Sequence, residues 1–130
     1  MKALLSAVLV CTLTGTLHAA VDTPGESGNA FLRMCSVIDK DDAGKTGREK
    51  MQEVACVGYI NGVGDGVEAS ITFAQVQNSS VRKPYCLPSD AENGQLVRIV
   101  LKYVKGHPEL AHMPTAGLVM LALQEAFPCR

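Results

Sequence analysis

The positions of five cysteines constrain this chain more than any other feature of its sequence. Cys11 lies in an apolar stretch near the start of the chain. The other four are spread over the rest, at Cys35, Cys56, Cys86 and Cys129. No two of them have the C-x2-C spacing with which zinc knuckles bring two thiolates onto one turn. The sequence therefore favours two disulfides, and we expect neither a metal site nor a bound cofactor.

Residues 1–20 have the pattern of a secretory signal peptide. Lys2 supplies the positive end, an apolar core follows, and small residues favour cleavage after Ala19 or Ala20. Polar residues interrupt the apolar run too early for a membrane-spanning helix of about 20 residues, so we expect no membrane segment after cleavage. This pattern predicts export to the periplasm, where oxidising conditions favour disulfides, and one domain over residues 21–130.

Apolar residues at three- and four-residue steps predict helices in the first half of the exported chain. A short helix is expected to begin with Asn29 as its N-cap. Thr46 and Glu49 form a capping box, which predicts a long helix running to about Gln77. The expected apolar stripe of this helix consists of Val54, Tyr59, Ile60, Val63, Val67, Ile71 and Ala74.

The second half of the chain predicts two further helices. Residues 78–88 form a polar connection that we expect on the surface. Ser89 and Glu92 make a second capping box, which predicts a helix that ends before Pro108. Pro114 suits the first position of a last helix, which is largely apolar and is expected at the centre. No alternating strand pattern occurs, so we predict an all-α, disulfide-stapled bundle of about four main helices.

The order of the helices suggests how the cysteines pair. If the last two long helices pack antiparallel, the start of one lies beside the end of the other. This arrangement brings Cys86 near Cys129, and Cys35 then pairs with Cys56 to join the first helix to the long one. The other two pairings remain alternatives, because spacing alone does not decide between them.

Three glycines, Gly58, Gly62 and Gly66, recur at four-residue steps on one face of the predicted long helix. Each glycine costs a helix about 1 kcal/mol relative to alanine, so three on one face indicate that something approaches closely. We expect a neighbouring helix of the same domain to pack there. A seam with a second copy or another partner is the alternative.

Charge and composition argue for binding rather than catalysis. The formal net charge is −1 and Trp is absent, which argues against nucleic acid as a partner. His107 and His112 flank the turn between the last two helices, and such residues are more often loop or capping residues than catalysts. Asp65 and Glu68 are interpreted as a solvated face. We expect a protein that is not an enzyme, and turnover lost on replacing either histidine would contradict this.

An ordered set of motifs runs through nearly the whole exported chain. The set consists of Phe31-Leu32-x-x-Cys35, Cys56-x-x-Tyr59-Ile60-x-Gly62-Val63-x-Asp65-Gly66, Cys86-x-Pro88, Gln95-Leu96, Tyr103, His107-Pro108-Glu109 and Ala122-Leu123-x-x-Ala126-Phe127-Pro128-Cys129. In this order the motifs resemble the Rap/Tai family of periplasmic immunity proteins of type VI secretion systems. The resemblance implies a helical protein that inhibits a secreted peptidoglycan amidase by blocking its active site, in some members as a homodimer.

Two surface segments are our candidates for contacting such an amidase, because loops on a rigid scaffold commonly insert into clefts. They contain Gln77, Asn78, Arg82 and Lys83 in one segment, and His107 and His112 in the other. The alternative function is a small periplasmic stress chaperone or another non-enzymatic binding protein. A chaperone requires exposed apolar surface and no single tight partner.

Overall fold

The computed structural model describes residues 22–129 and confirms an all-α fold, with no strand in that range. Its α-helices are α1 Gly28–Cys35, α2 Gly47–Gln77, α3 Asn93–Gly106 and α4 Thr115–Ala126, with short 3-10 turns η1 Ser36–Asp39, η2 Asp42–Gly44 and η3 Pro108–Leu110. The predicted signal peptide lies outside the described residues. No helix among those described is both long and apolar enough to cross a membrane.

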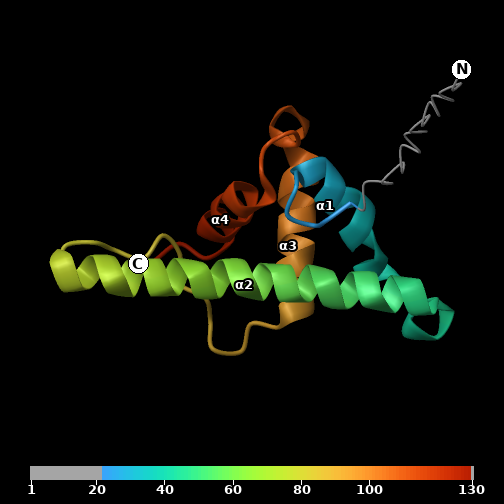
Figure 1. Ribbon diagram of the computed structural model, residues 1–130, viewed down its shortest axis with the longest axis horizontal. Helices are drawn as coiled ribbons and strands as arrows, with labels where there is room; N and C mark the ends of the chain where they lie inside the picture. Colours follow the sequence, from blue (N-terminus) through green and yellow to red (C-terminus); the bar gives the residue numbers. More distant parts are fainter. Residues whose placement is uncertain (1–21, 130) are drawn as a thin grey trace, which may run out of the picture.

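Helix α2 is a long rod, and the other three helices gather on one side of it (Figure 1). All four helices contact one another, and α3 makes the most extensive contacts with the other three, so it occupies the middle of the arrangement. The largest fully buried side chains of α1, α3 and α4 are Phe31, Val97, Val100, Val104, Leu118, Val119 and Leu123. The last helix was predicted to be buried centrally, and this is confirmed for one face only, because Leu118, Val119 and Leu123 are buried while Met120 and Leu121 are exposed.

The start of α2 is the capping box predicted from the sequence. The Thr46 hydroxyl accepts a hydrogen bond from the Glu49 amide at 3.3 Å, and the Glu49 carboxylate accepts one from the Thr46 amide at 2.9 Å. Along the rod only Cys56 and Ile60 are fully buried. Including Val54 in the apolar stripe was wrong, because this side chain points away from the core and is 66% exposed.

Helix α1 begins earlier than predicted, because its N-cap is Ser27 rather than Asn29. The Ser27 hydroxyl accepts a hydrogen bond from the Ala30 amide at 3.2 Å. Gly28 follows, and a Cβ at this position would lie 2.6 Å from the Leu118 side chain. The absence of a side chain at Gly28 therefore lets α1 approach α4 closely.

The second capping box predicted at residues 89–92 does not form. The Ala91 amide instead donates a hydrogen bond to the Pro88 carbonyl oxygen at 3.2 Å and closes a turn. Helix α3 starts only after Glu92, whose side chain makes no capping hydrogen bond. Helix α4 likewise begins one residue later than predicted, because Pro114 is its N-cap rather than its first residue.

Two disulfides join distant parts of the chain. Cys35–Cys56 links α1 to α2, and Cys86–Cys129 links the segment before α3 to the end of the chain, with Cα–Cα distances of 5.7 and 5.0 Å. These are the pairs preferred from the sequence. Cys86 lies well before α3 in an extended segment, however, and its amide donates a hydrogen bond to the Phe127 carbonyl oxygen at 2.9 Å. Cys86 is therefore brought beside Cys129 by this extended segment, and not by the start of a helix as predicted.

Candidate functional site

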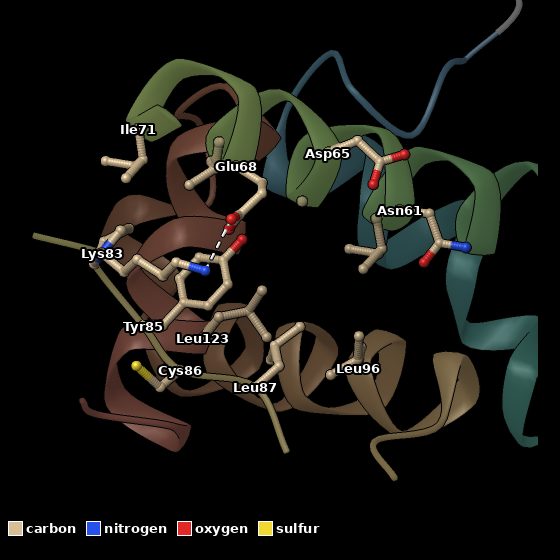
Figure 2. Close-up of a pocket in the computed structure, with 14 residues that line it drawn as sticks. Asn61, Asp65, Glu68, Ile71, Lys83, Tyr85, Cys86, Leu87, Leu96 and Leu123 are labelled. Atoms are coloured by element: carbon tan, nitrogen blue, oxygen red, sulfur yellow. Dashed lines mark hydrogen bonds and ion pairs between the residues drawn. The ribbon is translucent and has the colours of Figure 1, made fainter. Parts of the chain in front are cut away.

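A pocket of about 540 Å³ lies between α2 and the extended segment that precedes α3. Figure 2 shows polar side chains of α2 along one side of it and leucines along the other. The residues that define its character are Ile60, Asn61, Asp65, Glu68, Lys83, Tyr85, Leu87, Leu96 and Leu123. We call it the Tyr85 pocket. It combines charged groups at the rim with an apolar floor supplied by the core.

The hydroxyl of Tyr85 is the unusual group of this pocket. Tyr85 is only 8% exposed, and its hydroxyl has no hydrogen-bond partner among the described residues. A Cβ added at Gly64 would lie 3.9 Å from the hydroxyl oxygen, which places that oxygen close to α2. A buried donor left without an acceptor costs about 1–3 kcal/mol. A ligand that supplies an acceptor would recover this free energy.

Burial raises the pKa of Tyr85, and the nearby Glu68 carboxylate raises it further. The hydroxyl therefore stays protonated at neutral pH and offers a proton to an acceptor. Neither Tyr85 nor the space beneath Gly64 was identified from the sequence. The connection over residues 78–88 was expected on the surface, and this is wrong for Tyr85, because the adjacent Cys86 ties the segment to the end of α4. An aromatic residue directly beside a disulfide cysteine was the available signal.

One end of the Tyr85 pocket carries an ion pair. Lys83 Nζ lies 2.8 Å from Glu68 Oε1, and both side chains are about half exposed. Figure 2 shows this pair beside the Tyr85 hydroxyl. Exposed ion pairs contribute only about 0–1 kcal/mol to stability. A charged group of a ligand can therefore replace one member of this pair at little cost in free energy. Asp65 forms no ion pair within residues 22–129 and leaves the rim with one excess negative charge.

The chemistry of the pocket suits recognition. Within the described part of the chain, no three His, Cys, Asp or Glu side chains gather closely enough to hold a metal ion. Asp65 and Glu68 are exposed, as their interpretation as a solvated face predicts, but they also line the pocket. Carboxylates beside an apolar wall and a buried hydroxyl donor match a ligand that is positively charged at one end and apolar along its length.

The first segment proposed as a partner contact lies at the tip of α2 and just beyond it. It contains Gln77, Asn78, Arg82 and Lys83. A second hollow, of about 660 Å³, lies there and is lined by Arg82, Lys83 and the cysteines of the Cys86–Cys129 disulfide. Lys83 borders both hollows. Of the residues proposed from the sequence as contacts, it is the one that the structure brings to the Tyr85 pocket.

The second proposed segment lies elsewhere, beyond the end of α3 and away from the tip of α2 (Figure 1). The His107 ring stacks on Tyr103 with 4.2 Å between the ring centroids, and its Nδ1 lies 2.9 Å from the Tyr103 carbonyl oxygen. His107 therefore packs on the last turn of α3. His112 is exposed. The structure does not bring the two proposed segments together into one surface.

The glycine face of α2 is open. A Cβ at Gly58, Gly62 or Gly66 would meet nothing within 4 Å among the described residues. The expectation that a helix of the same domain packs there was wrong, because α1, α3 and α4 all lie on the opposite side of the rod. Large apolar side chains share this exposed side by helical spacing, namely Met51, Val54, Phe73 and Val76. We call these four residues and the three glycines the outer face of α2.

Comparison with known protein families identifies one family whose sequence pattern this chain matches. A model of the Rap1a immunity proteins matches residues 27–129. No curated protein and no solved structure is significantly similar to the chain. The matched range contains all four helices, both disulfides and every residue of the Tyr85 pocket.

Proposed function

Because the chain belongs to the family of Rap1a immunity proteins, we propose that it binds and inhibits a peptidoglycan amidase delivered by a type VI secretion system. The family match carries this proposal, since it covers nearly all of the described residues. The amidase as target follows from the resemblance to the Rap/Tai family. The signal peptide pattern supports the periplasm as the place where the two proteins meet.

The shape of the molecule supports inhibition by binding. Two disulfides hold the helices in place, so little ordering of the scaffold is needed when a partner binds, and pre-organisation of this kind strengthens affinity. The Tyr85 pocket and the adjacent tip of α2 form one continuous surface around Lys83. We propose that this surface faces the amidase, while the segment around His112 stays outside the contact.

The test is protection in the periplasm. A type VI amidase effector of the same genome is exported in a sensitive bacterium, alone or together with the full chain. We expect lysis by the amidase alone and survival when the chain is co-expressed. Deleting residues 1–20 should abolish protection while leaving inhibition of peptidoglycan hydrolysis by the purified proteins intact. Failure of the chain to protect against any such effector, or to inhibit it in vitro, would contradict the proposal.

The outer face of α2 supports a second contact, between two copies of this chain. Exposed apolar patches of this kind on soluble proteins often mark interaction sites. The 31-residue helix is about 46 Å long at 1.5 Å per residue, which offers an extended surface. Its glycines allow two such helices to approach closely, with Phe73 and Val76 packing beyond the crossing point. We propose a homodimer through this face. Asp65 lies seven residues after Gly58 and therefore on the same side of α2, whereas Tyr85 and Lys83 come from the segment before α3, so the dimer contact shares one rim of the Tyr85 pocket.

Light scattering during size-exclusion chromatography tests the dimer. We expect Phe73→Asp to convert a dimer to a monomer, and Leu121→Asp, a matched change at an exposed leucine of α4, to leave the dimer intact. A monomeric wild-type protein would contradict this assignment. If that monomer also suppresses aggregation of unfolded proteins at low pH and Phe73→Asp abolishes the effect, the exposed face supports the chaperone function instead.

A further inference from the structure

We propose that the Tyr85 pocket receives an arginine side chain of the partner protein, held by Asp65 and Glu68, and that Lys83 occupies its place in the free protein. This inference rests on the proposed function for the identity of the partner. It does not depend on that function for the chemistry of the pocket.

The charges at the rim select a cation. Asp65 and Glu68 are three residues apart on α2, a spacing at which side chains can reach one another on a helix surface. In the free protein Glu68 points toward Lys83 and Asp65 points away from it (Figure 2), so Asp65 turns toward Glu68 when the guanidinium binds. Lys83 neutralises only Glu68, because Asp65 has no ion pair among the described residues. The planar guanidinium of arginine presents donors to two carboxylates at once, which an ammonium group cannot do with the same geometry. An arginine therefore has an advantage over Lys83 for this pair of acids.

The opposite wall accommodates the rest of an arginine side chain. Leu87 is 40% exposed in the free protein, and it lies beside Leu96 across the pocket from the acids (Figure 2). The methylene stem of arginine packs against apolar surface while its head stays with charged partners. A volume of about 540 Å³ exceeds that of one side chain, so part of the main chain of the incoming segment enters as well.

The Tyr85 hydroxyl connects this binding to the displacement of Lys83. The hydroxyl lies beside the Lys83–Glu68 ion pair (Figure 2) and has no acceptor of its own. When the incoming guanidinium takes the place of Lys83 at Glu68, the lysine side chain moves away and uncovers the hydroxyl. A carbonyl oxygen of the entering segment then accepts its hydrogen bond. Binding thus satisfies a donor that the free protein leaves buried and unpaired.

Two blocked dipeptides test the pocket without the amidase. Acetyl-leucyl-arginine amide is titrated into nitrogen-15-labelled protein purified from the periplasm, and the amide signals of Gly64 and Tyr85 are followed by NMR. Acetyl-leucyl-citrulline amide is the matched control, because citrulline has nearly the same shape without the charge. We expect saturable shifts with the arginine peptide and at least tenfold weaker binding of the citrulline peptide. Equal shifts with both, or none, would overturn the inference.

Variants of the pocket give effects of opposite sign. Asp65→Asn and Tyr85→Phe should each weaken the arginine peptide about tenfold, whereas Lys83→Ala should tighten it, because it removes the competing cation. Asp41→Asn, an equal change of charge at an exposed residue outside the pocket, should have no effect. A Lys83→Ala protein that binds the peptide more weakly would show that Lys83 is a contact rather than a competitor, and would overturn the displacement.

The same variants are then titrated with the purified amidase by calorimetry, which separates this inference from the proposed function. We expect the amidase to lose affinity with Asp65→Asn and Tyr85→Phe but not with Asp41→Asn. If it binds all variants equally, the pocket is not its contact and the inference fails while the function stands. If the wild-type protein binds the arginine peptide but no amidase, the proposed function fails and the arginine site stands.

Discussion

The two sides of α2 belong to one helix and experience opposite environments. On the inner side, Cys56 and Ile60 are 1% and 2% exposed and pack into the core. On the outer side, Phe73 and Val76 are 69% and 82% exposed. Both sides are apolar, so hydrophobicity alone does not explain which side the other helices cover. The Cys35–Cys56 disulfide ties α1 to the inner side, and the fold is built against it, which leaves the outer side available for recognition.

The contrast predicts that changes on the stapled side unfold the protein and that changes on the outer side alter association. The largest effect is expected from removing the Cys86–Cys129 disulfide by replacing both cysteines with alanine. The bond closes a sequence separation of 43 residues, and its loss should cost about 4 kcal/mol through the entropy of the unfolded chain. Urea unfolding measures this change. Because the bond also holds Tyr85 in place, binding of the arginine peptide should be lost in parallel.

Retained peptide binding in that double variant would show that the hydrogen bond from Cys86 to Phe127 and the apolar packing suffice to form the pocket. The disulfide would then be needed for the stability of the fold but not for binding of the peptide. If removing the disulfide lowers the free energy of unfolding by well under about 2 kcal/mol, the unfolded state keeps residual structure around these residues.

A matched pair of truncations compares the two sides directly. Leu118→Ala removes a fully buried side chain of α4 and should cost about 2–5 kcal/mol. Phe73→Ala removes a larger side chain from the outer face and should change the stability of the monomer by less than about 0.5 kcal/mol. Urea unfolding at several protein concentrations separates the stability of the monomer fold from the stability that dimer formation adds. If the stability lost in Phe73→Ala grows with protein concentration, the dimer is confirmed. A large loss of stability that does not depend on concentration would contradict the exposure of this face in the monomer.

Glycines provide a third comparison, with effects of opposite sign. Gly28→Ala places a Cβ 2.6 Å from the Leu118 side chain and should destabilise the protein by about 1–3 kcal/mol. Gly58→Ala meets nothing within 4 Å and should stabilise the monomer by about 1 kcal/mol through helix propensity. Thermal melting measures both shifts. A Gly58→Ala protein with a weaker dimer but a more stable monomer would locate the helix crossing at this glycine.

Local patterns predicted much of the fold, and long-range geometry explains what they missed. The capping box at Thr46 needs only neighbouring residues, so α2 was found from its first turn to its end. Tyr59, Ile60, Val63 and Val67 of the predicted stripe pack on the core, but Val54 does not. It was included because α2 is apolar on both sides, and periodicity does not identify the side that faces the core. The Tyr85 pocket depends on the Cys86–Cys129 disulfide closing distant segments onto each other, which no local pattern contains. Asp65 and Glu68 were noticed in the sequence, but their apolar opposite wall was not.

The smallest expected effect concerns pH and the end of α2 that lies away from the pocket. A hydrogen bond from Lys40 and further bonds from Thr46 lower the pKa of Glu49 from its ordinary value of 4.5 to about 2. Since the folded state holds the carboxylate in its charged form, Glu49 contributes stability above pH 4.5 and loses this contribution as the pH falls toward 2. The contribution is small because the Lys40 partner is exposed and solvent screens ion pairs at the surface.

Glu49→Gln isolates this contribution. The difference in urea midpoint between wild type and Glu49→Gln should be present at pH 6 and should shrink by pH 3, because protonation removes the same charge that the substitution removes. Glu109→Gln, at an exposed residue with no ion pair in the described chain, should show a smaller pH-dependent difference. A difference that stays constant with pH would assign the effect of Glu49 to its capping hydrogen bonds rather than to its charge. Because neither Glu49 nor Glu109 lines the Tyr85 pocket, peptide binding should be unchanged in both variants. This result would separate the stability of the first turn of α2 from binding in the pocket.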